Sequence, residues 1–278
     1  MTQLWCNGEW LDSDDFPIAP MDRGAVLGLG LFETILALDG VPVFADRHLA
    51  RLRMGCQRLG WEISLPDLQE TAGELLVMSK LTSGRARVRL AVTGGSGSLN
   101  DLTAGCDRVV FIIARSLDHA PASLTVNLSP WSRNERSPLA GLKCASYAEN
   151  LVALDHARRQ GFDETVFLNT AGHLCEAATA NLFLVKSGTL HTPSIQSGCL
   201  PGITRAVVIE LAARHGIACE ERVTGLDDLH SADEIFLTSS TRGLVAVSRF
   251  GDRIFGPGPV TESLRGLWNE EIRRKIPG

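Results

Sequence analysis

Apolar residues up to Ala114 recur with the periods of both strands and helices, and turn residues separate the runs. Asn7-Gly8 and Asp39-Gly40 each lie between short apolar runs, which predicts two hairpin turns. The remaining pattern predicts helices over Asp46–Leu59 and Pro66–Lys80, and strands over Val88–Val92 and Val109–Ala114. A polar loop, Thr93–Asp107, lies between these two strands.

The pattern breaks at Ser116–Ala122, where we expect a linker between two domains, 1–117 and 118–278. Beyond it, the periodicity predicts a second set of alternating elements. The helices are expected at Ala148–Gln160, Ile203–His215 and Val260–Lys275, and the strands at Glu164–Leu168, Asn181–Lys186, Glu234–Leu237 and Leu244–Val247. This order of elements predicts an α+β protein.

Composition narrows the functional classes. The chain has 278 residues, of which 44% are hydrophobic, and a formal net charge of -5, which argues against a nucleic-acid partner. No apolar run reaches membrane-spanning length, and the first six residues lack the pattern of a signal peptide. The seven cysteines form no Cys-x-x-Cys pair, so we expect neither a zinc site nor a disulfide framework, and a reduced cytoplasm fits best.

Three segments carry candidate chemistry. Lys143 lies in Gly-Leu-Lys-Cys-Ala-Ser-Tyr (141–147), which we expect at the mouth of a helix, and Glu176 follows an apolar pair. Leu-Pro-Gly-Ile-Thr-Arg (200–205) places the amides of Ile203 and Thr204 in a first helical turn. Pyridoxal phosphate requires an amine for its aldehyde, a carboxylate for its ring nitrogen and a helix N-terminus for its phosphate.

A series of motifs runs through nearly the whole chain. They are Met21-Asp22-Arg23-Gly24, Gly28 to Thr34, His48 to Leu52, Gly141-Leu142-Lys143, Glu176 with Asn181-Leu182-Phe183, Leu200 to Arg205, and Asp233-Glu234. In this order they resemble the class IV aminotransferases, the fold type IV pyridoxal-phosphate enzymes. That family includes branched-chain and D-amino-acid aminotransferases, (R)-selective amine transaminases and 4-amino-4-deoxychorismate lyases. The resemblance implies a smaller N-terminal α/β domain and a larger, barrel-like C-terminal domain, as in the D-amino-acid enzymes.

The resemblance also implies roles for individual residues. Lys143 would be the catalytic residue that carries the cofactor, and Glu176 would pair with the ring nitrogen. The other cofactor contacts would be Arg51, Ile203, Thr204, Ser240 and Thr241 at the phosphate, Tyr147 at the phenolic oxygen and Leu200 against the ring. Tyr147 stands four residues after Lys143, where the branched-chain enzymes have five, so it could equally be a core aromatic residue. Arg23 would brace a turn, and Gly28 and Gly30 would allow close backbone approach.

The residues that would distinguish the substrate classes of the family do not all point to the same class. Gly94–Asn100 has no Arg-x-His pair, which disfavours a standard D-amino-acid aminotransferase. Phe32 falls where the family lines its substrate pocket. Thr34 is typical of the lyases, although the lyases' Arg-Gly-Tyr is missing. Arg242 is either a substitute grip for the substrate carboxylate or an exposed loop residue.

The favoured function is therefore an aminotransferase that moves an amino group between an amino acid or amine and a 2-oxo acid. The alternative is a lyase that converts aminodeoxychorismate into 4-aminobenzoate and pyruvate. A degenerate cofactor-binding protein is a third class, against which Lys143 and Glu176 both count. The resemblance implies a homodimer with small-molecule substrates, and no metal, nucleic-acid or membrane partner is expected.

Overall fold

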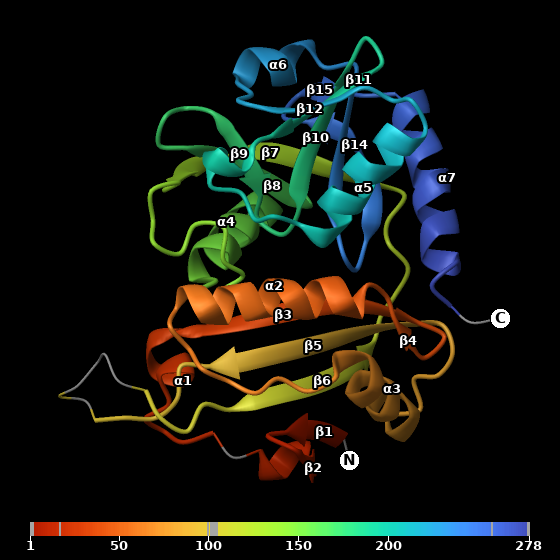
Figure 1. Ribbon diagram of the computed structural model, residues 1–278. Coiled ribbons are helices and arrows are strands. Elements are labelled where there is room, and N and C mark those ends of the chain that lie inside the picture. The colour runs from red at the N-terminus through yellow and green to blue at the C-terminus, as the bar shows by residue number, and fades with distance from the viewer. Residues whose placement is uncertain (1–2, 17, 99, 101–104, 257, 277–278) are drawn as a thin grey trace. The chain divides into compact units, whose positions relative to one another are not determined.

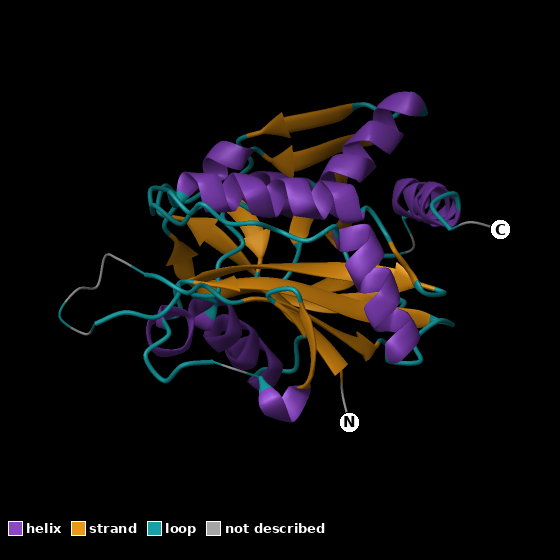
Figure 2. Ribbon diagram, turned by 60° about the horizontal axis from the view of Figure 1, so that its bottom comes forward, coloured by secondary structure: helices purple, strands orange, loops and turns teal. Residues whose placement is uncertain are grey.

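The computed structural model describes residues 3–16, 18–98, 100, 105–256 and 258–276. The chain divides into two compact units (Figure 1). Unit 1 comprises Met1–His119, Leu142–Tyr147 and Lys275–Gly278, and unit 2 comprises Ala120–Gly141 and Ala148–Arg274. Both units combine strands with helices (Figure 2), which confirms the α+β class. No helix in the described ranges is long and apolar enough to cross a membrane.

Unit 1 is built on an antiparallel sheet of six strands. Their order is β2-β1-β6-β5-β3-β4. The strands are β1 (Gln3–Cys6), β2 (Glu9–Asp12), β3 (Gly30–Leu38), β4 (Val41–Pro42), β5 (Arg85–Thr93) and β6 (Val110–Ser116). The two predicted hairpins are confirmed, with left-handed backbone at Asn7, Gly8, Asp39 and Gly40 as such turns require.

Two helices pack on one face of this sheet. They are α2 (Ala45–Arg58) and α3 (Leu68–Met78), and α1 (Arg23–Leu27) precedes β3. Leu49 and Leu52 of α2 share one hydrophobic core with Leu75 of α3 and with Val88 and Leu90 of β5. Both long helices were predicted, but α3 begins two residues after the predicted Pro66, because Asp67 accepts a hydrogen bond from the Glu70 amide and caps the helix there.

Unit 2 is built on a nine-stranded mixed sheet. The strand order is β12-β11-β10-β13-β14-β7-β8-β9, and β15 pairs with β14. The strands are β7 (Ser123–Arg133), β8 (Glu164–Asn169), β9 (Leu174–Ala177), β10 (Asn181–Lys186), β11 (Thr189–Pro193), β12 (Cys219–Arg222), β13 (Glu234–Ser239), β14 (Gly243–Phe250) and β15 (Arg253–Ile254). Leu174 of β9 and Leu182 of β10 share one core although four strands lie between β9 and β10, so the sheet curls into a half-barrel.

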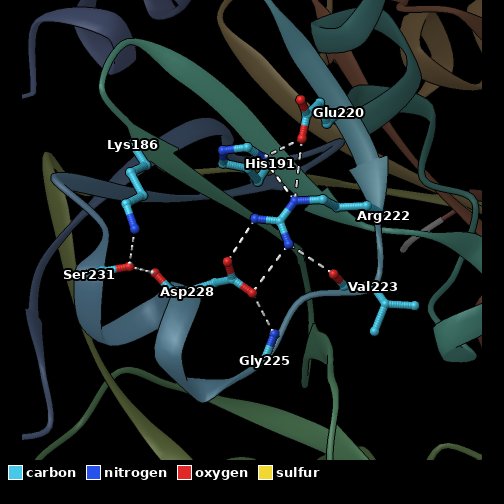
Figure 3. Close-up of polar contacts among 8 residues, drawn as sticks. All are labelled: Lys186, His191, Glu220, Arg222, Val223, Gly225, Asp228 and Ser231. Atoms are coloured by element: carbon cyan, nitrogen blue, oxygen red, sulfur yellow. Dashed lines mark hydrogen bonds and ion pairs between the residues drawn. The ribbon is translucent and has the colours of Figure 1, made fainter.

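The helices of unit 2 are α4 (Ala148–Arg159), α5 (Ile203–Arg214), α6 (Leu226–Ser231) and α7 (Pro259–Arg273). A polar network ties α6 to the sheet edge (Figure 3). Arg222 of β12 donates from Nη2 to Asp228 (2.7 Å) and from Nε to Nδ1 of His191 on β11 (3.2 Å). Arg222 thereby joins the outermost strand of the sheet to the short helix.

The periodicity identified every long helix, but it missed several strands. β7, β9, β11, β12 and β15 were not predicted, and neither were the short helices α1 and α6. Residues 99 and 101–104 of the predicted loop Thr93–Asp107 lie outside the described residues. The structure contains a break between β6, which ends at Ser116, and β7, which begins at Ser123, at the segment where the linker was expected.

Candidate cofactor and substrate site

Lys143 lies in a short extended segment beside β3. Its carbonyl accepts the Phe32 N–H (2.9 Å), and the Ala145 N–H donates to the Gly30 carbonyl (2.7 Å). A Cβ on Gly30 would stand 2.9 Å from the Val92 carbonyl oxygen, so glycine allows the close approach that was predicted there. The predicted start of a helix at Ala148, directly after the 141–147 segment, is confirmed, and within that segment Lys143 is held by pairing with a strand.

Two aromatic rings lie close to the Lys143 amine. Its Nζ lies 4.5 Å from the centre of the Phe32 ring and 5.6 Å from that of Tyr147. The two rings meet edge to face with 5.6 Å between their centres. Thr34 lies two residues after Phe32 on β3, so both side chains share one face of the sheet. The structure therefore brings together three of the predicted residues, Lys143, Tyr147 and Phe32, and it places Thr34 on the same face of the sheet as Phe32.

Arg89 belongs to the same face and was missed by the sequence analysis. It lies opposite Thr34 in the β3–β5 register, and its Cζ is 4.0 Å from the Phe32 ring centre. Burial lowers the pKa of the guanidinium, and no carboxylate of the described residues lies within 4 Å of it. The alternation of β5 could have found it, because every second residue of that strand faces the side of Phe32. A guanidinium with no acidic partner among the described residues, which contacts the same ring as an amine, is suited to a negatively charged substrate.

Glu176 lies on β9 with 9% of its surface exposed. Its Oε2 accepts the Leu200 N–H (2.9 Å), and the Leu200 carbonyl accepts the Asn181 side-chain amide (2.8 Å). A Cβ on Gly202 would come within 1.9 Å of the Asn181 Oδ1, so a larger residue there would displace the Asn181 side chain that bonds the Leu200 carbonyl. Glu176 is therefore fixed to the same backbone segment that leads into α5.

Arg133 on β7 is a second residue that the sequence analysis missed. Its Nη2 lies 3.9 Å from Oε1 of Glu176, and its guanidinium lies 4.6 Å from the centre of the Phe167 ring. Nη1 reaches Asn150 (3.4 Å). Nε and Nη2 are buried without a hydrogen-bond partner among the described residues. Glu176 therefore has a cationic neighbour as well as an amide donor. Single residues of this kind leave no periodic signal in a sequence.

The N-terminus of α5 has features of an anion site. The helix begins at Ile203 after Gly202, and no side chain caps it. Thr204 in its first turn is 2% exposed, and its Oγ1 has no hydrogen-bond partner among the described residues. Thr238 on β13 has a buried hydroxyl in the same condition. Uncapped amides and an orphaned hydroxyl suit a phosphate group, so the residues present fit the predicted phosphate contact.

Ser240, Thr241 and Arg242 form the turn between β13 and β14. Arg242 donates from Nη2 to the Thr179 hydroxyl (2.6 Å) and to Glu164 (3.2 Å), a carboxylate with no exposed surface. Arg242 thus has an acidic partner inside unit 2, in contrast to Arg89.

A family model described as class IV amino-transferase matches residues 30–250. The chain belongs to this family. Among its relatives, the branched-chain-amino-acid aminotransferase of Salmonella typhimurium is 30% identical over 98% of this chain and 94% of the relative. The aminodeoxychorismate lyase of Bacillus subtilis is 27% identical over 98% of this chain and 96% of the relative. The crystal structure of the Escherichia coli branched-chain amino acid aminotransferase superimposes with a TM-score of 0.90 at 26% identity, covering 99% of this chain and 96% of that one.

These comparisons confirm the family resemblance and the fold. Members of the class IV aminotransferase family are pyridoxal-phosphate-dependent enzymes that act on small amino and oxo acids. The relatives include both aminotransferases and a lyase, the two activities between which the sequence analysis was divided.

Proposed function

We propose that this class IV aminotransferase family member uses pyridoxal phosphate to transfer an amino group between an amino acid or amine and a 2-oxo acid. The observation that carries the proposal is the Lys143 amine beside the Phe32 ring, with the Arg89 guanidinium against the same ring. This arrangement combines a nucleophilic amine with a cation that has no acidic partner among the described residues. The branched-chain aminotransferase relative supports this choice.

The resemblance assigns the cofactor contacts to individual residues. Lys143 would hold the aldehyde carbon of the cofactor, Tyr147 would donate to its phenolic oxygen and Arg51 would bind its phosphate. Glu176 would pair with the ring nitrogen. The remaining contacts would be Leu200 against the ring, and the amides of Ile203 and Thr204 with the hydroxyls of Thr204, Ser240 and Thr241 at the phosphate.

The chain's own residues would then perform the proton transfers. When bound, the cofactor supplies a carbonyl carbon for the amino group and a ring that withdraws electrons. The Lys143 amine, once released by the substrate, would take the proton from the substrate's α-carbon and return it. Glu176 would keep a proton on the ring nitrogen, and the Leu200 amide holds the carboxylate in one orientation. Phe32 and Thr34 would line the substrate side.

Lyase activity is the second candidate function, supported by the residue at position 34 and by one relative of known name. Thr34 directly follows Phe32-Glu33, as in the lyases, and it lies on the same face as Phe32. The Bacillus subtilis relative is named aminodeoxychorismate lyase. Both reactions need the same lysine and the same ring partner, so the two candidates differ only in the steps after the first proton is removed.

Absorption spectra distinguish the two candidates. The cofactor-loaded protein is mixed in separate cuvettes with alanine, with branched-chain amino acids and with (R)-1-phenylethylamine. An aminotransferase converts the pyridoxal band into the pyridoxamine band with at least one of these donors, and a 2-oxo acid restores it. A lyase leaves the band in place and releases 4-aminobenzoate and pyruvate from aminodeoxychorismate. A protein that shows neither response would contradict the proposal.

Arg89 and Arg242 offer a matched pair for testing carboxylate recognition. We expect Arg89→Ala to lower kcat/KM for amino acids by on the order of tenfold to a hundredfold, because a charged hydrogen bond to the carboxylate is lost. Conversion of an amine without a carboxylate should be spared. Arg242→Ala should affect both substrates alike, since its Nη2 is engaged by Glu164 and Thr179. If Arg242→Ala selectively lowered kcat/KM for amino acids and Arg89→Ala did not, Arg242 would be the residue that binds the carboxylate. If neither variant distinguished amino acids from the amine, backbone amides would be the remaining candidates.

We also propose that the active protein is a cytoplasmic homodimer, as the resemblance implies. Sedimentation at the enzyme concentration of the assay tests the oligomeric state, and a monomer with full activity would contradict it.

A further inference from the structure

Glu33 lies between Phe32 and Thr34 on β3, but its side chain faces the opposite side of the sheet, toward α2. It is 1% exposed. A carboxylate buried to this extent is stable only if other groups replace the water that it has lost. The partners of Glu33 come from a single helix, and one of them is the predicted phosphate ligand Arg51.

Arg51 and His48 of α2 supply these partners. Arg51 donates from Nε to Oε1 of Glu33 (2.8 Å) and from Nη2 to Oε2 (2.6 Å), while Nδ1 of His48 lies 2.7 Å from Oε2. A spacing of three residues puts both side chains on the same face of the helix. Two parallel bonds from one guanidinium edge fix both its position and its plane.

The charges within this cluster cancel at neutral pH. Burial by itself raises the pKa of Glu33, but the Arg51 guanidinium, with help from His48, holds that pKa well below its usual range. Burial lowers the pKa of His48 in spite of the neighbouring carboxylate. The cluster therefore consists of a carboxylate, a guanidinium and a neutral imidazole. It supplies directed N–H groups rather than a net positive charge.

We propose that Glu33, oriented by His48, is a positioning residue that holds Arg51 in the orientation needed to bind the phosphate of the cofactor. The inference rests on the proposed function, in which Arg51 contacts that phosphate. Glu33 accepts hydrogen bonds from Nε and Nη2 of Arg51, and Glu33 belongs to β3. The orientation of the guanidinium is therefore fixed by this strand. The neighbouring Phe32 amide on β3 also binds the Lys143 carbonyl. One strand thus positions both the phosphate ligand and the covalent anchor in unit 1.

Glu33→Gln distinguishes two possible effects of Glu33 on phosphate binding, the orientation of Arg51 and the neutralisation of its charge. The substitution leaves Arg51 with an uncompensated positive charge, which on electrostatic grounds alone would tighten phosphate binding. Loss of the bidentate grip predicts the opposite. We expect the dissociation constant of the cofactor-free protein for pyridoxal 5'-phosphate to rise on the order of tenfold to a hundredfold, with no change for pyridoxal, which lacks the phosphate. The phosphorus-31 resonance of the bound cofactor should shift toward that of the free compound.

Two further variants exclude a general loss of structure. Glu33→Asp keeps the charge but shortens the reach, and it should also reduce the preference for pyridoxal 5'-phosphate over pyridoxal. Glu234→Gln changes a buried carboxylate that accepts the Thr261 amide at the start of α7 (2.8 Å). This control should lower the unfolding temperature and leave the preference unchanged.

The outcomes separate this inference from the proposed function. If the wild-type protein prefers the phosphorylated compound and Arg51→Ala removes that preference while both Glu33 variants retain it, Glu33 does not position Arg51. Tighter binding by Glu33→Gln would overturn the inference in the same way. A wild-type protein with no affinity for pyridoxal 5'-phosphate would overturn the proposed function itself, and this inference with it.

Discussion

Lys143→Ala should abolish turnover while the protein keeps its fold and part of its affinity for the cofactor. In the proposed mechanism one amine supplies both the covalent attachment and the proton transfer, so we expect kcat to fall by at least about a thousandfold. The fold should survive, because Lys143 is tied to β3 through its backbone carbonyl, which alanine also provides. Steady-state kinetics, with unfolding monitored in parallel, measures both effects.

Borohydride reduction of the wild-type protein should fix the cofactor to the peptide that contains Lys143. Lys186 is a suitable control, because it is an exposed lysine whose Nζ donates to the Ser231 hydroxyl (2.9 Å), and neither residue is a candidate site residue (Figure 3). Lys186→Ala should retain full activity and the same labelled peptide. Label on any lysine other than Lys143, or a protein that never takes up the cofactor, would refute the assignment.

Glu176→Gln should reduce turnover more than cofactor affinity. Its amide is neutral, so the proton on the ring nitrogen loses its anionic partner, and we expect kcat to fall by on the order of a hundredfold. The proposed phosphate contacts are made by other residues, so cofactor affinity should change by less than about tenfold. The glutamine oxygen can still accept the Leu200 amide, which keeps the local backbone in place. Stopped-flow spectra and a cofactor titration measure the two quantities separately.

Glu220→Gln provides the comparison for Glu176. Glu220 is an exposed carboxylate that contacts His191 (3.2 Å) in the network at the sheet edge (Figure 3). Its replacement should leave both kcat and cofactor affinity unchanged. A Glu176→Gln enzyme with wild-type kinetics would mean that another acid pairs with the ring nitrogen.

The parts of the fold that the sequence predicted are those with local causes. The hairpin at Asn7-Gly8 depends on two residues that tolerate left-handed backbone, and α2 depends on apolar residues at helical spacing. The missed strands β9, β11 and β12 have four or five residues each. Runs of this length carry little periodic signal, and their pairing partners lie far away in the chain.

The candidate site shows the same division. Lys143, Glu176 and the 200–205 segment were identified by residue type and by resemblance, because each stands in a recognisable motif. Arg89 and Arg133 were not, since their significance comes from the ring or carboxylate that they face. Arg242 was considered as a ligand for the substrate, yet its contact with the buried Glu164 could not be inferred from a separation of 78 residues.

The sequence by itself determined the family, the long helices and the tight turns, and it predicted which groups react. These depend on local backbone preferences and on short motifs. Only the tertiary structure decided that Lys143 pairs with β3 ahead of α4, that the Leu200 amide grips Glu176 and that Glu33 orients Arg51. Each of these is a contact between residues distant in the chain, formed where a strand or helix presents one face to another. Their alignment depends on register and packing, which no local pattern encodes.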